Sequence, residues 1–178
     1  MPVTHSHLAR KFADGISEKF ASRQFREALR NAVSQYEHKA TAPLISQYLD
    51  EHLKAESAGS SPPTAVFTWE GNKKKGSPYG YPILGTWTFP DAAVLSPFRC
   101  AFEFDREAKL GGAGFKAALM KASVHVLSGA YEACVLVYIL QPRSTPHKYL
   151  NDGSDYTRRL IEALRANGLF LALTSASA

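Results

Sequence analysis

The segments CAFEFD, from Cys100 to Asp105, and ACVLVYIL, from Ala133 to Leu140, decide the fold that this sequence predicts. Alternation of apolar and acidic side chains in the first segment is typical of a strand whose two faces have different surroundings. Eight consecutive apolar residues in the second segment indicate a strand buried on both faces, as in the centre of a mixed or parallel sheet. Between the two segments, a Gly-rich stretch leads into a predicted helix at residues 115–127.

The same alternation of elements continues toward the C-terminus. An amphipathic helix is predicted at residues 155–166 and a last buried strand at residues 169–173. Strand, helix, strand, helix and strand in this order imply right-handed crossovers and a sheet that is covered by helices on both sides. The predicted fold class is therefore α/β, with a mixed central sheet.

The N-terminal third of the chain is predicted to be helical. Gly15 weakens the first helical segment, residues 4–20, which we expect to be broken or partly ordered. A second helix is predicted at residues 22–39, and a third one has Thr41 as its N-cap and Pro43 as an early residue. After these helices the pattern changes, and further strands are predicted at residues 64–69, 83–88 and 91–95.

Composition bounds the class of protein. The 178 residues predict one domain, with a helical part at residues 1–56 and a sheet-containing core at residues 64–174. The 21 Lys and Arg residues exceed the 16 Asp and Glu residues, and a solvated surface explains the net charge of +5 as well as a polyanionic partner does. The sequence has neither a membrane-spanning apolar run nor an apolar N-terminal signal, so we expect a cytoplasmic protein without a membrane partner. Cys100 and Cys134 are too few for a disulfide scaffold and are expected to be buried as small hydrophobic side chains.

Three carboxylates in otherwise apolar segments are the strongest functional signal. Glu103 and Asp105 are two residues apart on a predicted strand and therefore share one of its faces. A short hairpin would bring the strand that starts at Asp91 beside them. Like charges at close range are costly without a cation, and Mg²⁺ or Mn²⁺ prefers carboxylate oxygens. We therefore predict a metal site at these three residues, the alternative being a turn cap at Asp91 and two solvent-facing carboxylates on an antiparallel ribbon.

Pro90-Asp91, eleven intervening residues, Glu103-Phe104-Asp105, a helix and the buried strand ACVLVYIL together resemble the PD-(D/E)XK nuclease superfamily. This is the fold of many restriction endonucleases and of recombination and repair nucleases. The resemblance covers residues 41–173 and implies a restriction-endonuclease-like, three-layer α/β/α core preceded by N-terminal helices. It also implies a nuclease that hydrolyses phosphodiester bonds of DNA with Mg²⁺ or Mn²⁺ as its cofactor.

One position departs from the motif of the superfamily. Asp105 stands where most members have lysine, although some members recruit a lysine from the following helix, which here carries Lys116 and Lys121. The resemblance implies that Asp91, Glu103 and Asp105 bind the metal ion, or that Asp105 orients the attacking water. It implies that Lys121 lowers the pKa of that water or holds the phosphate. For any single lysine, an ordinary solvated helix face is the alternative.

Further lysines are suited to a phosphate backbone. Lys73, Lys74 and Lys75 lie in a polar loop between two predicted strands, and Lys116 lies on the helix after the Gly-rich stretch. Lysines that neutralise phosphates make binding strongly salt-dependent, and we predict DNA as the partner. A surface that merely keeps the protein soluble explains the lysine loop about equally well. In addition, Glu51 matches in type an acidic residue that some members of the superfamily place near the metal ion.

The missing motif lysine also indicates a second function. The chain would then be a non-catalytic module on a nuclease-like fold that binds nucleic acid or protein. Such a module predicts salt-sensitive binding without cleavage that metal ions stimulate. Many enzymes of the superfamily dimerise to cut both strands, so the resemblance is compatible with a homodimer.

Overall fold

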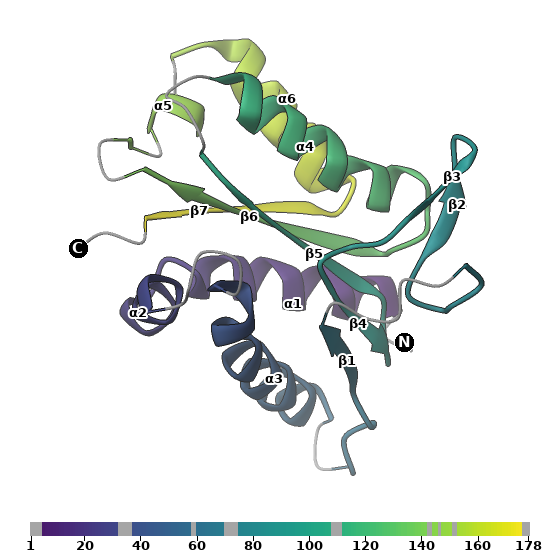
Figure 1. Cartoon of the computed structure of the whole chain (residues 1–178). Coiled ribbons are helices and arrows are strands. Elements are labelled where there is room, and N and C mark those ends of the chain that lie inside the picture. The colour runs from purple at the N-terminus through teal and green to yellow at the C-terminus, as the bar shows by residue number, and fades with distance from the viewer. Residues whose placement is uncertain are drawn as a thin grey trace.

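A five-stranded mixed sheet forms the centre of the computed structural model (Figure 1). The strands of the protein are β1 (Val66–Trp69), β2 (Tyr81–Ile83), β3 (Thr86–Thr88), β4 (Ala92–Ser96), β5 (Cys100–Arg106), β6 (Ala133–Leu140) and β7 (Leu169–Ser175). The main sheet has the order β1–β4–β5–β6–β7, and β2 and β3 form a separate two-stranded sheet. The structure describes residues 5–31, 37–57, 60–69, 75–107, 112–141, 144–145, 147–150 and 153–175.

The sheet combines antiparallel and parallel pairs. Strand β4 is antiparallel to both β1 and β5, whereas β5, β6 and β7 are parallel to one another. Helix α4 (Gly112–Leu127) connects β5 to β6, and α6 (Asp155–Ala166) lies between β6 and β7. A crossover of this length is what a parallel pair of neighbouring strands requires. The predicted α/β class and the predicted mixed sheet are confirmed.

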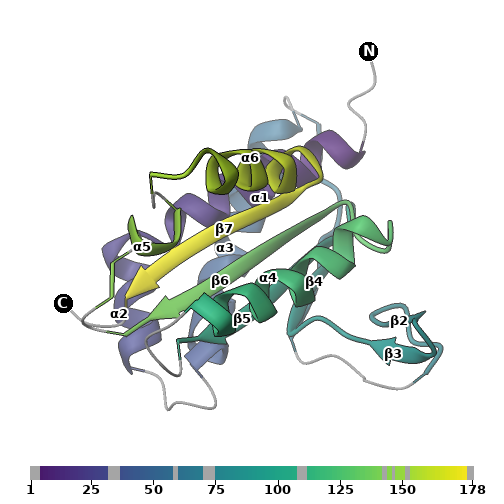
Figure 2. The same ribbon diagram turned by 90° about the horizontal axis from the view of Figure 1, so that it is seen from above.

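Helices cover both faces of the sheet (Figures 1 and 2). Helices α1 (His5–Lys19), α2 (Arg23–Asn31) and α3 (Glu37–Glu56) lie on one face. Helices α4 and α6, together with the short α5 (His147–Leu150), lie on the other face. The Ser154 side chain accepts a hydrogen bond from the Tyr156 amide at 3.1 Å and so caps the start of α6.

Strand β6 confirms the prediction of a strand buried on both faces, because each of its eight residues is buried. Val135, Val137 and Ile139 pack toward the helices α1–α3. Cys134, Leu136 and Tyr138 pack toward α4. A central strand of this kind loses contact with water along its whole length, which is why its sequence carries no polar residue.

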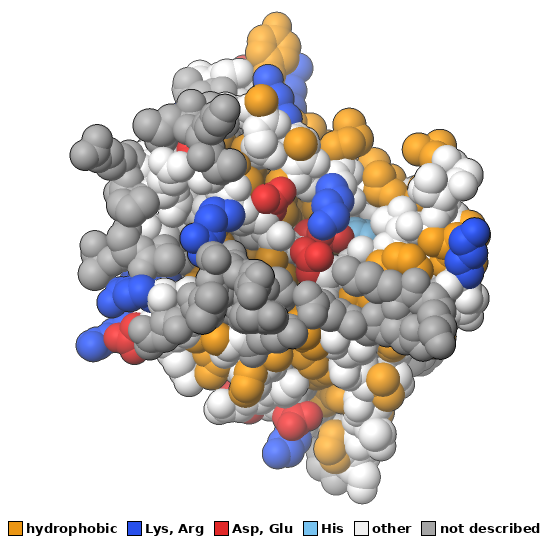
Figure 3. All heavy atoms as spheres, viewed as in Figure 1, with side chains coloured by type: hydrophobic (Ala, Val, Ile, Leu, Met, Phe, Trp, Pro, Cys, Tyr) orange, Lys and Arg blue, Asp and Glu red, His pale blue; other side chains and the backbone are white. Residues whose placement is uncertain are grey.

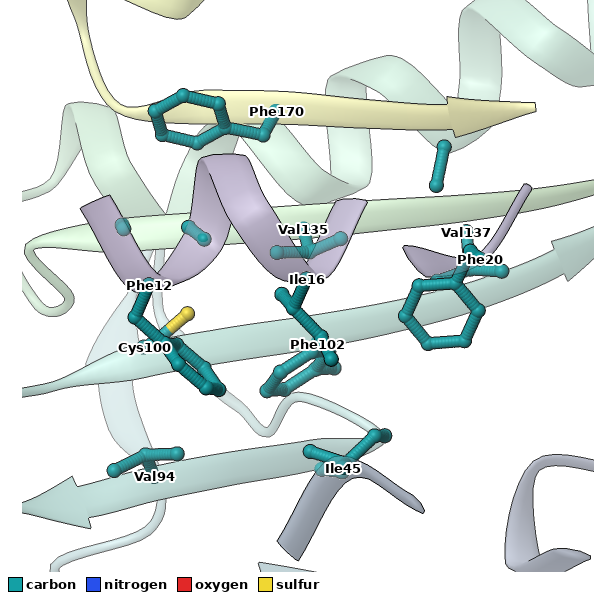
Figure 4. Close-up of a cluster of buried hydrophobic side chains, with 14 of the residues drawn as sticks. Phe12, Ile16, Phe20, Ile45, Val94, Cys100, Phe102, Val135, Val137 and Phe170 are labelled. Atoms are coloured by element: carbon teal, nitrogen blue, oxygen red, sulfur yellow. The ribbon is translucent and has the colours of Figure 1, made fainter. Parts of the chain in front are cut away.

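The larger apolar core lies between α1 and the sheet (Figure 4). Phe12 and Ile16 of α1, and Phe20 directly after this helix, pack against side chains of four strands and of α3. Those labelled in Figure 4 are Ile45, Val94, Cys100, Phe102, Val135, Val137 and Phe170. Complete burial of an aromatic or branched side chain contributes about 2 kcal/mol. This apolar layer holds β4 and β5 in place on the α1 side of the sheet. Polar groups of these strands can therefore lie on the opposite side, which α4 covers.

Helix α1 is continuous, so the predicted break at Gly15 is wrong. A Cβ atom at this position would collide with the hydroxyl group of Tyr48 on α3. The glycine therefore makes room for the Tyr48 side chain of α3 rather than interrupting α1. Its cost in helix propensity, about 1 kcal/mol, is offset by the packing of the apolar face of α1.

The predicted boundary between the second and third helices is also wrong. Helix α2 ends at Asn31, and α3 begins at Glu37 and continues through Pro43. Thr41, Ile45 and Leu49 are buried at intervals of four residues, so one continuous helix face reaches from before the proline to the middle of α3. Packing against α1 and the sheet therefore overrides the local signal for a helix start at Thr41.

A hairpin replaces the single strand that was predicted at residues 83–88. Strands β2 and β3 pair in antiparallel register around Leu84 and Gly85, which have φ values of +48° and +76°. Positive φ at both central residues is what a two-residue turn of type I′ requires. Figures 1 and 2 show this hairpin standing to one side of the main sheet, near β4 and the end of α4.

Both cysteines are buried in neighbouring strands without a disulfide bond, as predicted. Within the part of the chain that the structure describes, no helix has the length and apolar character needed to cross a membrane.

Candidate functional site

The first part of the site is formed where β4 begins beside β5. The backbone amide of Asp91 donates to the carbonyl of Phe102 at 3.0 Å, and the amide of Phe104 donates to Oδ2 of Asp91 at 2.9 Å. The antiparallel pairing that the sequence predicted thus fixes the Asp91 carboxylate against the backbone of β5. The turn-cap alternative for Asp91 is not what the structure has, because its side chain bonds to the neighbouring strand.

Glu103 lies next to Asp91 on the face of the sheet that α4 covers. Phe102 and Phe104 point to the opposite face, into the core beneath α1. Glu103 is only 1% exposed, and its Oε1 lies 2.6 Å from Nε2 of His125 on α4. The strand periodicity therefore predicted the face of Glu103 correctly, but the carboxylate is buried rather than directed to solvent.

Lys121 joins the two carboxylates. Its Nζ contacts Oε2 of Glu103 and lies 3.7 Å from Oδ2 of Asp91. Helix α4 positions it, because buried Phe115, Leu119 and Ala122 hold one side of the helix against β6. The Lys121 side chain is 50% exposed, so the group that neutralises the buried Glu103 is also open to solvent. We refer to Asp91, Glu103 and Lys121 as the carboxylate–lysine cluster.

The pKa values of the cluster reflect burial and mutual attraction. Burial raises the pKa of Glu103, the nearby charge of Asp91 adds to this, and the His125 hydrogen bond and the Lys121 charge oppose it. Burial lowers the pKa of Lys121, but the attraction of Glu103, Asp91 and Asp105 outweighs it and raises that pKa overall. Lys121 is therefore a cation at neutral pH.

A second chain of contacts extends from Glu103 through His125 to the hairpin. His125 is fully buried, and its Nδ1 lies 2.8 Å from the hydroxyl group of Tyr81, the first residue of β2. Burial raises the pKa of Tyr81 to about 12, so its hydroxyl keeps its proton at neutral pH. The sequence predicted no function for His125. It lies four residues after Lys121, and this spacing on a helix next to an acidic strand is the signal by which the sequence could have identified it.

Asp105 lies farther along the strand. Its side chain is exposed, and its Oδ1 accepts a hydrogen bond from the amide of Arg106 at 2.7 Å. It shares the face of Glu103 and adds to the field at Lys121. Among the described residues, no three side chains of His, Cys, Asp or Glu are grouped so that they could hold a metal ion by themselves. The structure thus brings two of the three predicted carboxylates together.

Two carboxylates are nevertheless a donor set that suits Mg²⁺. This ion keeps several water ligands and is commonly bound by one or two carboxylates together with the phosphates of a substrate. Oε2 of Glu103 is buried and contacts Nζ of Lys121, which is half exposed. A buried, anionic oxygen favours a cation as its partner, and this one already attracts an ammonium group that solvent can reach. The residues present therefore fit a hard divalent ion.

The remaining predicted residues lie in different places. Lys75 is exposed before the hairpin, and Lys116 is exposed on α4, whereas Lys73 and Lys74 lie outside the described residues. Glu51 lies on α3, across the sheet from α4, where it accepts a hydrogen bond from Gln47 at 2.9 Å. It therefore does not belong to the carboxylate–lysine cluster.

Figure 3 shows acidic side chains beside a lysine or arginine side chain and a histidine near the middle of one face of the molecule. Comparisons of this chain with protein-family models, with curated proteins and with solved structures found no match. Its function has to be inferred from the geometry of the cluster.

Proposed function

We propose that this protein is a metal-dependent nuclease of restriction-endonuclease-like fold that hydrolyses phosphodiester bonds of DNA. The observation that carries the proposal is the contact of Lys121 with Glu103, 3.7 Å from Asp91. A lysine from the helix after β5 thereby reaches the two carboxylates that correspond to the superfamily motif. The superfamily resemblance is also supported by the order of elements, in which a helix precedes the sheet and α4 separates β5 from β6.

The two carboxylates have a distinct task in this proposal. Asp91 and Glu103 would hold Mg²⁺ or Mn²⁺, which supplies an activated water and stabilises charge on the phosphate. The Phe104 amide holds one oxygen of Asp91, and His125 holds one oxygen of Glu103. Each carboxylate is therefore oriented by one contact. In Asp91 the oxygen that the amide holds, Oδ2, is also the one nearest Lys121, whereas Glu103 offers Oε2, the oxygen that His125 does not hold.

Lys121 supplies a fixed positive charge at the point where the phosphate would bind. Because attraction by three carboxylates raises its pKa, it acts as a cation that holds a phosphate oxygen or the attacking water rather than as a general base. Its half-exposed side chain can reach a substrate from solvent without rearrangement of the core. In this role Lys121 takes the place of the motif lysine, and Asp105 on the same face orients the water.

The basic residues complete the proposal. Lys116 lies on α4, the helix that carries Lys121, and Lys75 lies in the turn before the β2–β3 hairpin; both are exposed and can contact a phosphate backbone. A cytoplasmic location and a homodimer stay predictions from the sequence.

Metal-dependent cleavage of DNA tests the proposal. The wild-type protein, Asp91→Asn and Glu103→Gln are incubated with supercoiled plasmid and with single-stranded DNA, in Mg²⁺, in Mn²⁺ or in EDTA. We expect cleavage by the wild type only with a metal ion, and a loss of at least about 100-fold in both variants. Glu51→Gln, an exposed glutamate on the opposite side of the sheet, is the matched control and should cleave normally. Activity that survives both Asp91→Asn and Glu103→Gln would contradict the assignment.

Calorimetric titration with Mn²⁺ separates the nuclease from the non-catalytic module. The nuclease requires Mn²⁺ binding that Glu103→Gln abolishes. Salt-sensitive DNA binding without any Mn²⁺ binding at millimolar concentration would favour the module.

A further inference from the structure

We propose that His125 and Tyr81 are positioning residues that fix the metal-binding carboxylate of Glu103, an inference that rests on the proposed function. Neither residue would touch the substrate or the ion. They act through Glu103, by holding Oε1 so that Oε2 faces Lys121 and Asp91.

The hydrogen bonds of His125 select one arrangement of the ring. An ionised Glu103 can only accept, so Nε2 of His125 carries the proton and donates to Oε1 at 2.6 Å. Nδ1 then has a free lone pair and accepts from the hydroxyl group of Tyr81 at 2.8 Å. The Tyr81 proton thus fixes the tautomer of His125, and that tautomer fixes the orientation of the carboxylate.

Packing leaves the imidazole little freedom to turn. The ring of His125 is fully buried and meets the rings of Tyr81 and Tyr131 edge-on, with both centroids 5.7 Å away. A ring held in this way keeps Oε1 of Glu103 on the side of His125, away from Lys121 and Asp91. Only Oε2 then remains for the ion pair with Lys121 and for a metal ion.

Tyr81 also connects this arrangement to a separate part of the fold. It belongs to β2, which pairs with β3 and is not a member of the five-stranded sheet. The Tyr81 hydroxyl therefore joins the hairpin to His125 on α4, and through His125 to Glu103 on β5. A shift of the hairpin would free Nδ1 of His125 and with it the alternative tautomer, which cannot donate to Glu103 through Nε2.

The test compares Mn²⁺ affinities by calorimetry in the full chain without DNA. His125→Leu removes the donor to Glu103 and should weaken Mn²⁺ binding about 10- to 100-fold. His125→Gln places an amide N–H near the former Nε2 and should recover most of the affinity. Tyr81→Phe keeps the ring but loses the hydroxyl, and it should weaken binding several-fold.

Tyr131→Phe is the matched control. Tyr131 packs against the same imidazole, but its hydroxyl donates to the backbone carbonyl of Tyr79 at 2.6 Å and has no link to Glu103. We expect its Mn²⁺ affinity to equal that of the wild type. In ¹⁵N spectra, His125 should be the Nε2–H tautomer in the wild type and in Tyr131→Phe, and a mixture in Tyr81→Phe.

The outcomes separate this inference from the nuclease proposal. Wild-type Mn²⁺ binding that Glu103→Gln removes, together with unchanged binding in Tyr81→Phe and in folded His125→Leu, would overturn the positioning role alone. Absence of Mn²⁺ binding in the wild type would contradict the nuclease proposal and the positioning role together. If His125→Leu does not fold, Tyr81→Phe and its ¹⁵N spectrum decide the matter.

Discussion

The ammonium group of Lys121, on helix α4, contacts the buried carboxylate of Glu103, on strand β5. The Glu103 side chain is only 1% exposed, whereas that of Lys121 is half exposed. Removal of the lysine would leave a buried carboxylate without its cation, and addition of a phosphate would place a second anion beside the same cation. The consequences of this pair for activity and for stability can be measured separately.

Lys121→Ala should slow DNA cleavage about 100- to 1,000-fold at saturating DNA, because a charge aimed at the reacting phosphate is lost. Rates measured under single-turnover conditions check this value, with thermal unfolding as the measure of folding. Lys116→Ala, an exposed lysine on the same helix, is the control. It should weaken DNA binding without changing the saturated rate. A Lys121→Ala protein that is folded and cleaves as fast as Lys116→Ala would exclude Lys121 from the reaction.

Glu103→Gln should stabilise the protein at alkaline pH. Burial raises the pKa of Glu103 in the folded state, so the folded protein holds this proton more tightly than the unfolded chain does. The contribution of this proton to the free energy of unfolding is complete below the pKa of the unfolded state, and it is lost as pH rises through the pKa of the folded state. Near pH 8 the glutamine variant should therefore be about 1 kcal/mol more stable than the wild type, and this advantage should vanish toward pH 4. Urea unfolding at both pH values checks the sign, and a less stable variant at pH 8 would show that ionised Glu103 stabilises the fold.

Glu107→Gln should have the opposite pH dependence. Glu107 is buried, and its carboxylate accepts hydrogen bonds from the Tyr149 hydroxyl and, at 3.0 Å, from the Gln141 amide, with Lys148 3.5 Å away. Burial opposes ionisation, but these donors and the lysine outweigh it and lower the pKa of Glu107 to about 2. Its stabilisation is present above the unfolded pKa and is lost as pH falls through the folded value. The variant should lose about 2 kcal/mol near pH 7 and much less near pH 2. An equal loss at both pH values would indicate packing rather than charge.

Lys75→Ala and Lys116→Ala should each lower the salt dependence of DNA binding. Fluorescence anisotropy in EDTA, which prevents cleavage, gives the slope of log affinity against log salt concentration. If each lysine neutralises one phosphate, each variant should reduce this slope by about 1. Lys54→Ala, an exposed lysine on α3 across the sheet, is the control and should leave it unchanged. Identical slopes in the wild type and the three variants would show that DNA contacts neither Lys75 nor Lys116.

The elements that were predicted correctly are those whose pattern lies within one short sequence segment. The bounds of β6 and α6 follow from an uninterrupted apolar run and from an amphipathic helix, both of which are local patterns. The limits of α3 were not predictable in this way. Its start before Thr41 depends on packing against α1, which a local cap signal does not contain.

Residues of the site were likewise predictable where the signal is local, and not where it depends on the tertiary fold. Strand alternation and hairpin geometry predicted that Asp91 and Glu103 lie together, and the family resemblance implied that Lys121 of the following helix reaches them. The contact of Tyr81 with His125 depends on how the β2–β3 hairpin folds back toward α4, and no residue spacing encodes it. The hairpin itself was missed because its turn contains Leu84 at positive φ, where glycine or asparagine is usual.

The rate of plasmid cleavage by the wild type and by Glu103→Gln, in Mn²⁺ and in EDTA, tests the central claim most directly. The account predicts cleavage by the wild type in Mn²⁺, none in EDTA and at least about 100-fold less by the folded variant. Equal rates for the two proteins in Mn²⁺, or no cleavage by either one, would contradict the claim that Asp91, Glu103 and Lys121 form the active site of a nuclease.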